Sequence, residues 1–158
     1  MKKLYTLLFI LFSSTIVQAN TSPAPKEPQL MTQDEMERLV INHVDVIEQT
    51  QGYVVFTYKQ VKIALISDVK HDRMRMISPI TEYAKVTTKQ KDLIMEANFH
   101  SALDARYASS NDTLYSAFIH PMSSLNKADI LSAIEQVATL ALTFDSSYSS
   151  GTLSFGGQ

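Results

Sequence analysis

Hydrophobic residues along this chain follow two different periods, one typical of helices and one typical of strands. Helical spacing occurs in three segments: residues 33–50, residues 89–102 and a stretch that starts near Asn126. Thr32 and Thr87 precede the first two segments, each followed three residues later by the Glu or Gln of a capping box. Asn126 is itself a favourable N-cap. The pattern predicts three helices, with Gly52 able to end the first.

Between these helices the period shortens to that of strands, with many aromatic and β-branched residues. Five strands are predicted: residues 53–58, 61–66, 73–77, 105–108 and 113–119. In the third strand Arg73 and Arg75 should face water, while Met74 and Met76 face the core. Pro79 lacks a backbone N–H, so we expect it at a strand exit or a sheet edge.

The predicted order is helix, three antiparallel strands, helix, two strands and helix. Short connections between the first three strands favour an antiparallel meander. Helices combined with an antiparallel sheet predict an α+β fold with one sheet packed against helices.

This order of elements resembles that of the YbjN family and of the class I type III secretion chaperones, which share one α+β fold. The resemblance spans roughly Thr32 to Phe144. It also rests on Ile77-Ser78-Pro79-Ile80 at a strand end and on the five-residue loop before the last helix. The resemblance implies a non-enzymatic domain that binds protein segments, often as a homodimer. Secretion chaperones act in the cytoplasm, so an export signal would be a departure from that group.

The N-terminal segment has the layout of a secretory signal peptide. Lys2 and Lys3 precede an apolar run, residues 4–12, and small residues follow up to Ala19. The apolar run is too short for a membrane-spanning helix, which needs about 20 apolar residues. We therefore expect cleavage after Ala19, a periplasmic or secreted protein, and no stable membrane anchor after cleavage.

Four segments are predicted along the chain. Residues 1–19 form the signal peptide, and residues 20–31 form a linker that holds three of the five prolines. Residues 32–145 form the α+β domain. Residues 146–158 are rich in serine and glycine and are expected to be a flexible tail.

Composition excludes several classes of function. The chain contains no cysteine, which removes disulfides, thiol nucleophiles and thiolate metal sites. Its 14 Lys and Arg against 16 Asp and Glu give a formal charge of −2, or −4 once Lys2 and Lys3 leave with the signal peptide. This balance argues against a nucleic-acid partner, which needs concentrated positive charge.

The sequence contains no catalytic, cofactor-binding or metal-binding motif, so we expect neither an enzyme nor a cofactor. His43, His71, His100 and His120 lie at least twenty residues apart, without the local spacing of zinc ligands. His43 falls on the apolar stripe of the first predicted helix and is expected to be a core residue. His71 and Asp72 share a predicted turn, and without a positioned nucleophile they indicate a solvated turn rather than a catalytic site.

Aromatic and methionine side chains on the predicted strands are the candidates for a partner-binding surface. A strand can bury only one of its faces against helices, so some of these side chains are expected on an exposed apolar face. The speculative set is Tyr53, Phe56, Tyr58, Met74, Met76 and Tyr115. Ordinary core filling is the competing interpretation. The segment 53–58 is also expected to be a sheet edge to which an extended peptide could add.

The function we expect is that of an exported, non-enzymatic, chaperone-like module that binds an unknown protein or peptide and forms a homodimer. The alternative is a small-ligand-binding or enzymatic α+β domain, with a pocket between sheet and helices and His120 among its lining residues. Such a pocket would need a histidine and a carboxylate within hydrogen-bond reach. A structural envelope component, attached through the linker and the tail, is a third interpretation.

Overall fold

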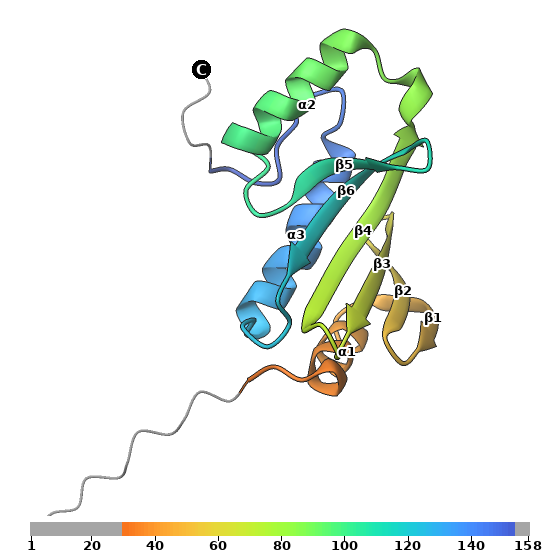
Figure 1. The fold of residues 1–158 in the computed structure, drawn as a ribbon, viewed down its shortest axis with the longest axis vertical. Coiled ribbons are helices and arrows are strands. Elements are labelled where there is room, and N and C mark those ends of the chain that lie inside the picture. Colours follow the sequence, from red (N-terminus) through yellow and green to blue (C-terminus); the bar gives the residue numbers. More distant parts are fainter. Residues whose placement is uncertain (1–29, 154–158) are drawn as a thin grey trace, which may run out of the picture.

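The computed structural model describes residues 30–153 and has the predicted α+β architecture (Figure 1). The predicted signal peptide, residues 1–19, nearly all of the predicted linker and residues 154–158 of the predicted tail lie outside the described residues. Between residues 30 and 153, no helix has the length and apolar character needed to cross a membrane.

Three α-helices, one short 3-10 helix and six strands make up the described part of the chain. In order they are α1 (Gln33–Ile41), β1 (Asp45–Thr50), β2 (Tyr53–Tyr58), β3 (Val61–Asp68), β4 (Arg73–Glu82), η1 (Tyr83–Lys85), α2 (Thr88–His100), β5 (Arg106–Ser110), β6 (Thr113–His120) and α3 (Lys127–Leu142). The strands form one antiparallel sheet in the order β1-β2-β3-β4-β6-β5. β1 and β5 are therefore its two edges.

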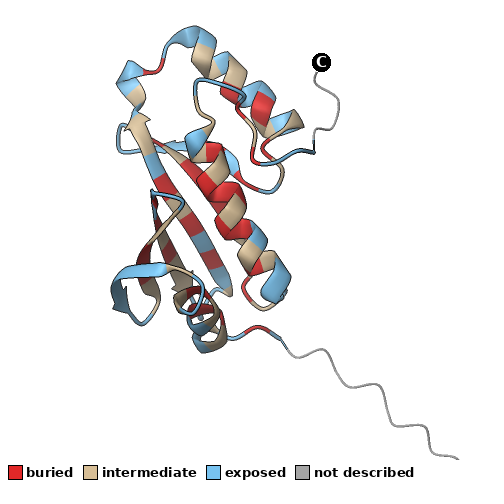
Figure 2. Cartoon of the chain, turned by 180° about the vertical axis from the view of Figure 1, so that it is seen from behind, coloured by how far each residue is buried: buried red, intermediate tan, exposed pale blue. Residues whose placement is uncertain are grey.

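The two faces of the sheet differ in what covers them. α1 and α3 lie on one face, and Figure 2 shows buried residues along the side of α3 that packs on the strands. The core between this helix and the sheet includes Phe56, Ile63, Leu65, Met76, Leu114, Ile130, Ile134 and Val137. No helix of the described chain covers the opposite face, because α2 lies beside the edge strand β5 (Figure 1).

The predicted N-caps are confirmed. The Thr32 hydroxyl accepts a hydrogen bond from the Glu35 N–H at 3.2 Å. Thr87 and Asn126 both begin full capping boxes, in which the third helical residue bonds back to the backbone of the cap. These side chains satisfy amide groups that would otherwise lack partners at the helix ends.

The prediction of a helix over residues 33–50 is wrong in its second half. α1 ends at Ile41, and residues 45–50 form β1, so four strands rather than three precede α2. This segment contains Val46, Ile47 and Thr50, whose β-branched side chains favour strands. Pairing with β2 supplies the long-range hydrogen bonds. Gly52, with φ of +80°, belongs to the β1–β2 turn instead of ending the helix.

β4 is longer than predicted and runs through Pro79. The ladder with β3 stops at Ile77, so the proline lies beyond the part of β4 that needs a donor on that side. The ladder with β6 is interrupted by a register shift just after Pro79. The expectation that Pro79 marks an edge position is met on the β3 side of the strand.

The predicted flexible tail begins as a packed segment. Tyr148 is buried, and its ring meets that of Tyr107 edge-on at 6.1 Å between centroids. The Ser150 hydroxyl donates a hydrogen bond to the Ala102 carbonyl at 2.6 Å. Residues 146–151 therefore pack beside the end of α2, contrary to the prediction, because Tyr148 provides an apolar anchor.

Candidate functional site on the uncovered sheet face

Three of the six predicted binding residues are core residues. Phe56, Met74 and Met76 point toward the helices and are almost entirely buried. Burial removes them from any accessible surface, so their assignment to partner binding is wrong and the core-filling interpretation holds. Their burial also confirms the predicted alternation in β4, where Arg73 and Arg75 are exposed.

The other three predicted residues are half-buried tyrosines with different surroundings. Tyr58 lies on the helix-covered face, and its hydroxyl donates to the Glu135 carboxylate at 2.9 Å. Tyr53 and Tyr115 lie on the uncovered face, paired in register with Ile66 and Pro79 respectively. Only these two members of the predicted set therefore lie on a face open to a partner.

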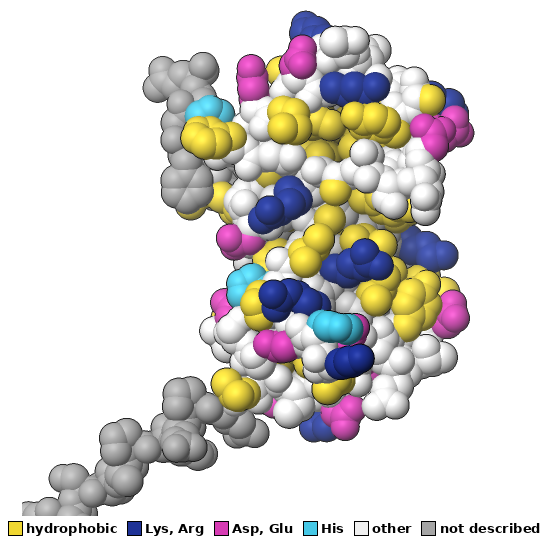
Figure 3. Space-filling model, viewed as in Figure 1, with side chains coloured by type: hydrophobic (Ala, Val, Ile, Leu, Met, Phe, Trp, Pro, Cys, Tyr) yellow, Lys and Arg dark blue, Asp and Glu magenta, His cyan; other side chains and the backbone are white. Residues whose placement is uncertain are grey.

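Aliphatic side chains outside the predicted binding set line the middle of the uncovered face, where Val55 and Ala117 are buried and Ile119 is exposed. One row crosses all six strands: Glu48, Val55, Ala64, Ile77, Ala117 and Arg106. The next row is Thr50, Tyr53, Ile66, Arg75 and Ile119. Figure 3 shows hydrophobic side chains gathered over this face with Lys and Arg side chains among them. Strand alternation could have found these residues, since each is two positions from another on its strand.

An open hollow of about 340 Å³ lies on this face. Ile66 of β3 and Ile119 of β6 supply apolar lining, and Arg73 and Arg75 of β4 lie between these strands. Ile119 is 52% exposed. The hollow thus combines an accessible apolar surface with two guanidinium groups, which suits a ligand with both apolar and anionic groups.

The hollow also includes the carboxylate of Asp68, which is already bonded. It accepts hydrogen bonds from the backbone N–H of His71 at 3.1 Å and lies 2.7 Å from that residue's ring nitrogen Nδ1. These contacts with His71 hold the pKa of Asp68 below its usual value. His71 thus pairs with Asp68 and not with Asp72, its neighbour in the sequence.

Asp72 instead connects two loops. Its carboxylate accepts hydrogen bonds from the Ser123 N–H at 2.8 Å and from the Ser123 hydroxyl at 2.6 Å. These bonds lower the pKa of Asp72. The contacts hold the β3–β4 turn against the loop before α3, which is a structural role.

The two edges of the sheet are protected in different ways. At β5, the Asn98 side chain of α2 accepts from the Tyr107 N–H at 2.7 Å and donates to the Tyr107 carbonyl at 3.1 Å, which covers that edge. β1 is exposed at all six residues, but its ladder has a bulge between Val46 and Glu48. Bulges and charged side chains discourage pairing with another strand. The predicted edge, β2, is paired on both sides, so that prediction is wrong.

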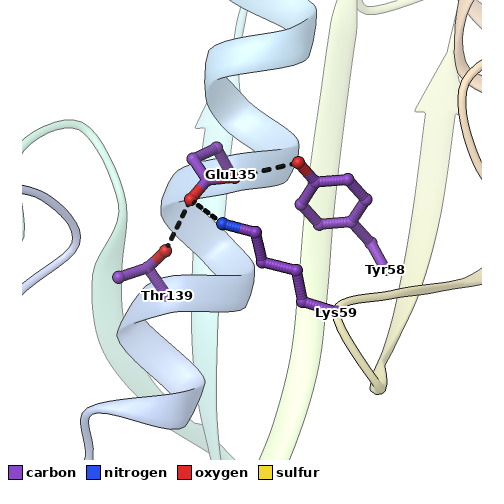
Figure 4. Close-up of polar contacts among 4 residues, drawn as sticks. All are labelled: Tyr58, Lys59, Glu135 and Thr139. Atoms are coloured by element: carbon purple, nitrogen blue, oxygen red, sulfur yellow. Dashed lines mark hydrogen bonds and ion pairs between the residues drawn. The ribbon is translucent and has the colours of Figure 1, made fainter.

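A second polar cluster joins the β2–β3 turn to α3 (Figure 4). Glu135 accepts hydrogen bonds from the Lys59 ammonium at 2.5 Å, from Tyr58 at 2.9 Å and from the Thr139 hydroxyl at 3.1 Å. The Lys59 contact is the main cause that lowers the pKa of Glu135, and the bond to Glu135 raises the pKa of Tyr58. Each polar group in this cluster already has a hydrogen-bond partner within the cluster. The role of the cluster is therefore to hold the β2–β3 turn against α3.

The histidines have different surroundings in the described part of the chain. Within residues 30–153, no group of three His, Asp or Glu side chains is placed to hold a metal ion. His43 was expected in the core, but α1 ends before it, and its exposed ring stacks on Tyr58 with centroids 6.1 Å apart. His120 lines a cavity of about 180 Å³ between β6 and α3, together with Asp104 and Asp129.

The cavity beside His120 lacks the hydrogen-bonded pair that an enzymatic interpretation requires. The ring nitrogen Nδ1 of His120 lies 3.0 Å from the Pro121 carbonyl and 3.2 Å from the Ser124 hydroxyl. Neither Asp104 nor Asp129 is among these hydrogen-bond partners. The arrangement therefore supplies no general base directed at a nucleophile.

The outer side of α2 forms a separate apolar surface. Met95 and Phe99 are 69% and 78% exposed, and their spacing of four residues places them on the same side of the helix. Only Ile94 and Ala97 of this helix are buried. We call Met95 and Phe99 the α2 stripe.

No family model and no curated protein matches this sequence. Solved structures with a similar fold include a chain of the HopA1–SchA chaperone–effector complex, at 8% identity and a TM-score of 0.53 over 71% of this chain and 88% of that chain. A chain of the ExsC–ExsE complex gives 9% identity and a TM-score of 0.52 over 71% and 92%.

A third similar structure is that of the Yersinia pestis type III secretion chaperone SycH in complex with a fragment of YscM2. It gives 12% identity and a TM-score of 0.53 over 71% of this chain and 98% of that chain. At such low identity the likeness concerns the fold alone. The chain thus has the α+β fold found in these chaperone complexes, as the sequence resemblance implied.

Proposed function

We propose that this chain is an exported, non-enzymatic, chaperone-like module that binds segments of other proteins through its uncovered sheet face. The observation that carries this proposal is the apolar surface formed by the half-buried Ile66 and the exposed Ile119 beside the hollow. Accessible apolar surface of this kind, bordered by charged groups, is typical of sites that bind proteins or ligands. The similar solved structures are themselves complexes with protein partners, which supports the same role here.

The face is a better binding surface than the free edge at β1. That edge has a bulge and carries Asp45 and Glu48 on the side of the uncovered face. Strand addition would have to pair with an interrupted ladder. Contacts with side chains on the face need no such pairing.

Export is part of the proposal and rests on the signal-peptide layout of residues 1–19. Fractionation of cells that produce the full chain tests it directly. We expect the protein in the periplasm or the medium, with Asn20 as its first residue by mass spectrometry. Recovery of uncleaved protein from the cytoplasm would contradict export but would leave the binding surface untouched.

Binding can be tested with two matched substitutions of exposed aliphatic residues. Ile119→Asp places a charge on the uncovered face, whereas Val69→Asp does the same in the β3–β4 turn, at a residue 62% exposed. Each variant is produced from the full coding sequence with a C-terminal tag and purified from the cell fraction that contains it, and co-purifying proteins are quantified by mass spectrometry. We expect specific partners to be lost with Ile119→Asp and kept with Val69→Asp. Equal capture by both folded variants would show that this face is not the binding surface.

We further propose that a second copy of the chain covers the α2 stripe. Two large apolar side chains, more than two-thirds exposed on one side of a helix, are costly to leave in water. Because α2 lies beside the edge strand β5 and not over β3 and β4 (Figure 1), a dimer formed through the α2 stripe would leave the uncovered face accessible.

A further inference from the structure

We propose that the segments this protein binds are acidic, with carboxylates that contact Arg75 and Arg73 and apolar side chains that occupy the hollow beside Ile66 and Ile119. This inference rests on the proposed protein-binding function and defines the chemistry of its partner. It is carried by the charge and the spacing of the groups on the uncovered face.

Arg75 has an unusual position for a charged residue. It lies in the middle of the sheet, paired in register with Ile66 on one side and Ile119 on the other. Its side chain is exposed, and within residues 30–153 it has neither a hydrogen bond nor an ion pair. A guanidinium group with apolar neighbours in register and no ion pair is well placed to bind a carboxylate supplied by a partner.

Arginines outnumber carboxylates around the hollow. Arg73 lies two residues earlier on the same strand, in register with Asp68, and Arg106 lies at the β5 end of the neighbouring row. The one carboxylate in the hollow, that of Asp68, is bonded to His71. Asp45 and Glu48 are also on this face, but they lie on β1, at the far edge of the sheet. The chain as a whole has more acidic than basic residues, so the local excess of arginine is not a consequence of composition.

An extended acidic peptide fits these features better than an anionic membrane does. Polybasic segments that bind anionic lipid generally have clusters of about four to eight Lys and Arg residues. The uncovered face has three arginines near the hollow, together with apolar surface set among them. Successive residues of an extended segment point to opposite sides, so a segment in which pairs of acidic and pairs of apolar residues alternate would present both kinds of side chain to the sheet.

Designed peptides provide the test. A labelled peptide of about eight residues, with Glu-Glu-Val-Val repeated twice (the Glu–Val peptide), presents both residue types on each side and is about 26 Å long when extended, close to the width of about 24 Å expected for six strands. Fluorescence anisotropy with the full chain measures its affinity. The comparison peptides replace every Glu with Lys, or every Val with Ser. We expect the Glu–Val peptide to bind best, and its binding to weaken as ionic strength rises toward about 0.15 M.

Two arginine variants test the location of the site. Arg75→Gln is expected to weaken binding of the Glu–Val peptide by about tenfold, the loss typical of one charge-assisted hydrogen bond. Arg38→Gln is the control, because Arg38 is an exposed arginine on α1. Circular dichroism checks that both variants keep the fold.

Equal binding of the Glu–Val and Lys–Val peptides would overturn the inference, as would an unchanged affinity in Arg75→Gln. Binding to vesicles of anionic phospholipid in preference to the acidic peptide would also overturn it. A different result would reject the proposed function itself: capture of the same partners by Ile119→Asp and by Val69→Asp. Loss of partners in Ile119→Asp without a preference for acidic peptides would reject the acidic specificity alone.

Discussion

Gln60 has a left-handed backbone conformation although it is not glycine. It and Lys59 form the β2–β3 turn with φ of 66° and 49°. This conformation costs roughly 1–2 kcal/mol for a residue with a Cβ atom. Substitution by glycine would remove that cost, but the greater flexibility of glycine in the unfolded chain would offset part of the gain. We therefore expect Gln60→Gly to raise the free energy of unfolding by about 0.5–1 kcal/mol, measured by urea denaturation. Lys62→Gly, at an exposed strand position, should instead lower it, and stabilisation by both would contradict this explanation.

Glu135 makes stability depend on pH. Its hydrogen bonds, with Lys59 first, lower its folded pKa below the ordinary value of 4.5. The contribution of Glu135 to the free energy of unfolding is therefore complete above the ordinary pKa and is lost as pH falls through the folded pKa. We expect Glu135→Gln to be less stable than the wild type at neutral pH, by less than about 1 kcal/mol because the pair is partly exposed.

The difference in unfolding free energy between the wild type and Glu135→Gln should shrink below pH 4.5. Urea denaturation across the acid range measures it. Glu96→Gln removes the same charge from an exposed position on α2 and should change stability at neutral pH by no more than about 0.5 kcal/mol. A difference for Glu135→Gln that stays constant or grows toward low pH would reject the role of its ionised carboxylate.

At the scale of elements, α2 protects the sheet edge through one side chain. Asn98 bonds both backbone groups of Tyr107 that face away from β6. Asn98→Ala would leave a partly buried N–H and carbonyl without partners, at a cost of about 1–3 kcal/mol. We expect that loss in urea denaturation, together with faster amide hydrogen exchange at Tyr107. Asp92→Ala, on an exposed position of the same helix, is the control, and similar losses in both variants would indicate a general effect on α2.

Local pattern predicted most elements but could not place β1. β2 has the predicted bounds, and the caps of α2 and α3 were found because capping is a local interaction. Residues 45–50 have a spacing that also fits a helix, and their strand conformation depends on pairing with β2. Such pairing is a long-range contact, which a helical period in a single segment does not reveal.

The candidate site was harder to predict than the fold. Alternation placed Met74 and Met76 in the core and Arg73 and Arg75 in water, as observed. It did not show which strand faces lie together on the side without helices, because that depends on strand order and register. Ile119 was therefore not among the predicted binding residues, although it lies on an exposed part of the face. Arg75 indicates a site for an anionic group because the strand register places it between two isoleucines of neighbouring strands, and the sequence alone does not reveal that register.

At the scale of the whole molecule, the α2 stripe and the uncovered face leave separate surfaces for self-association and for partner binding. A charge in the α2 stripe would have to be desolvated in a dimer interface, which is unfavourable without a partner charge. We expect the full chain to be a dimer by light scattering and Phe99→Asp to be a monomer. The urea midpoint of Phe99→Asp should equal the midpoint that the wild type reaches at low protein concentration, where its dimer has dissociated. Phe99 is 78% exposed within one chain, so its replacement should not affect the folding of that chain.

Ile119→Asp is the matched control for the dimer, since it charges the other surface and should leave the dimer intact. The two variants together separate the functions. Phe99→Asp should still bind the acidic peptide, with a similar affinity per chain, whereas Ile119→Asp should lose it while remaining dimeric. A wild-type monomer would reject the second copy as the cover of the α2 stripe. Loss of peptide binding in Phe99→Asp would instead mean that the binding surface is completed by the partner chain, and that the two surfaces are not independent.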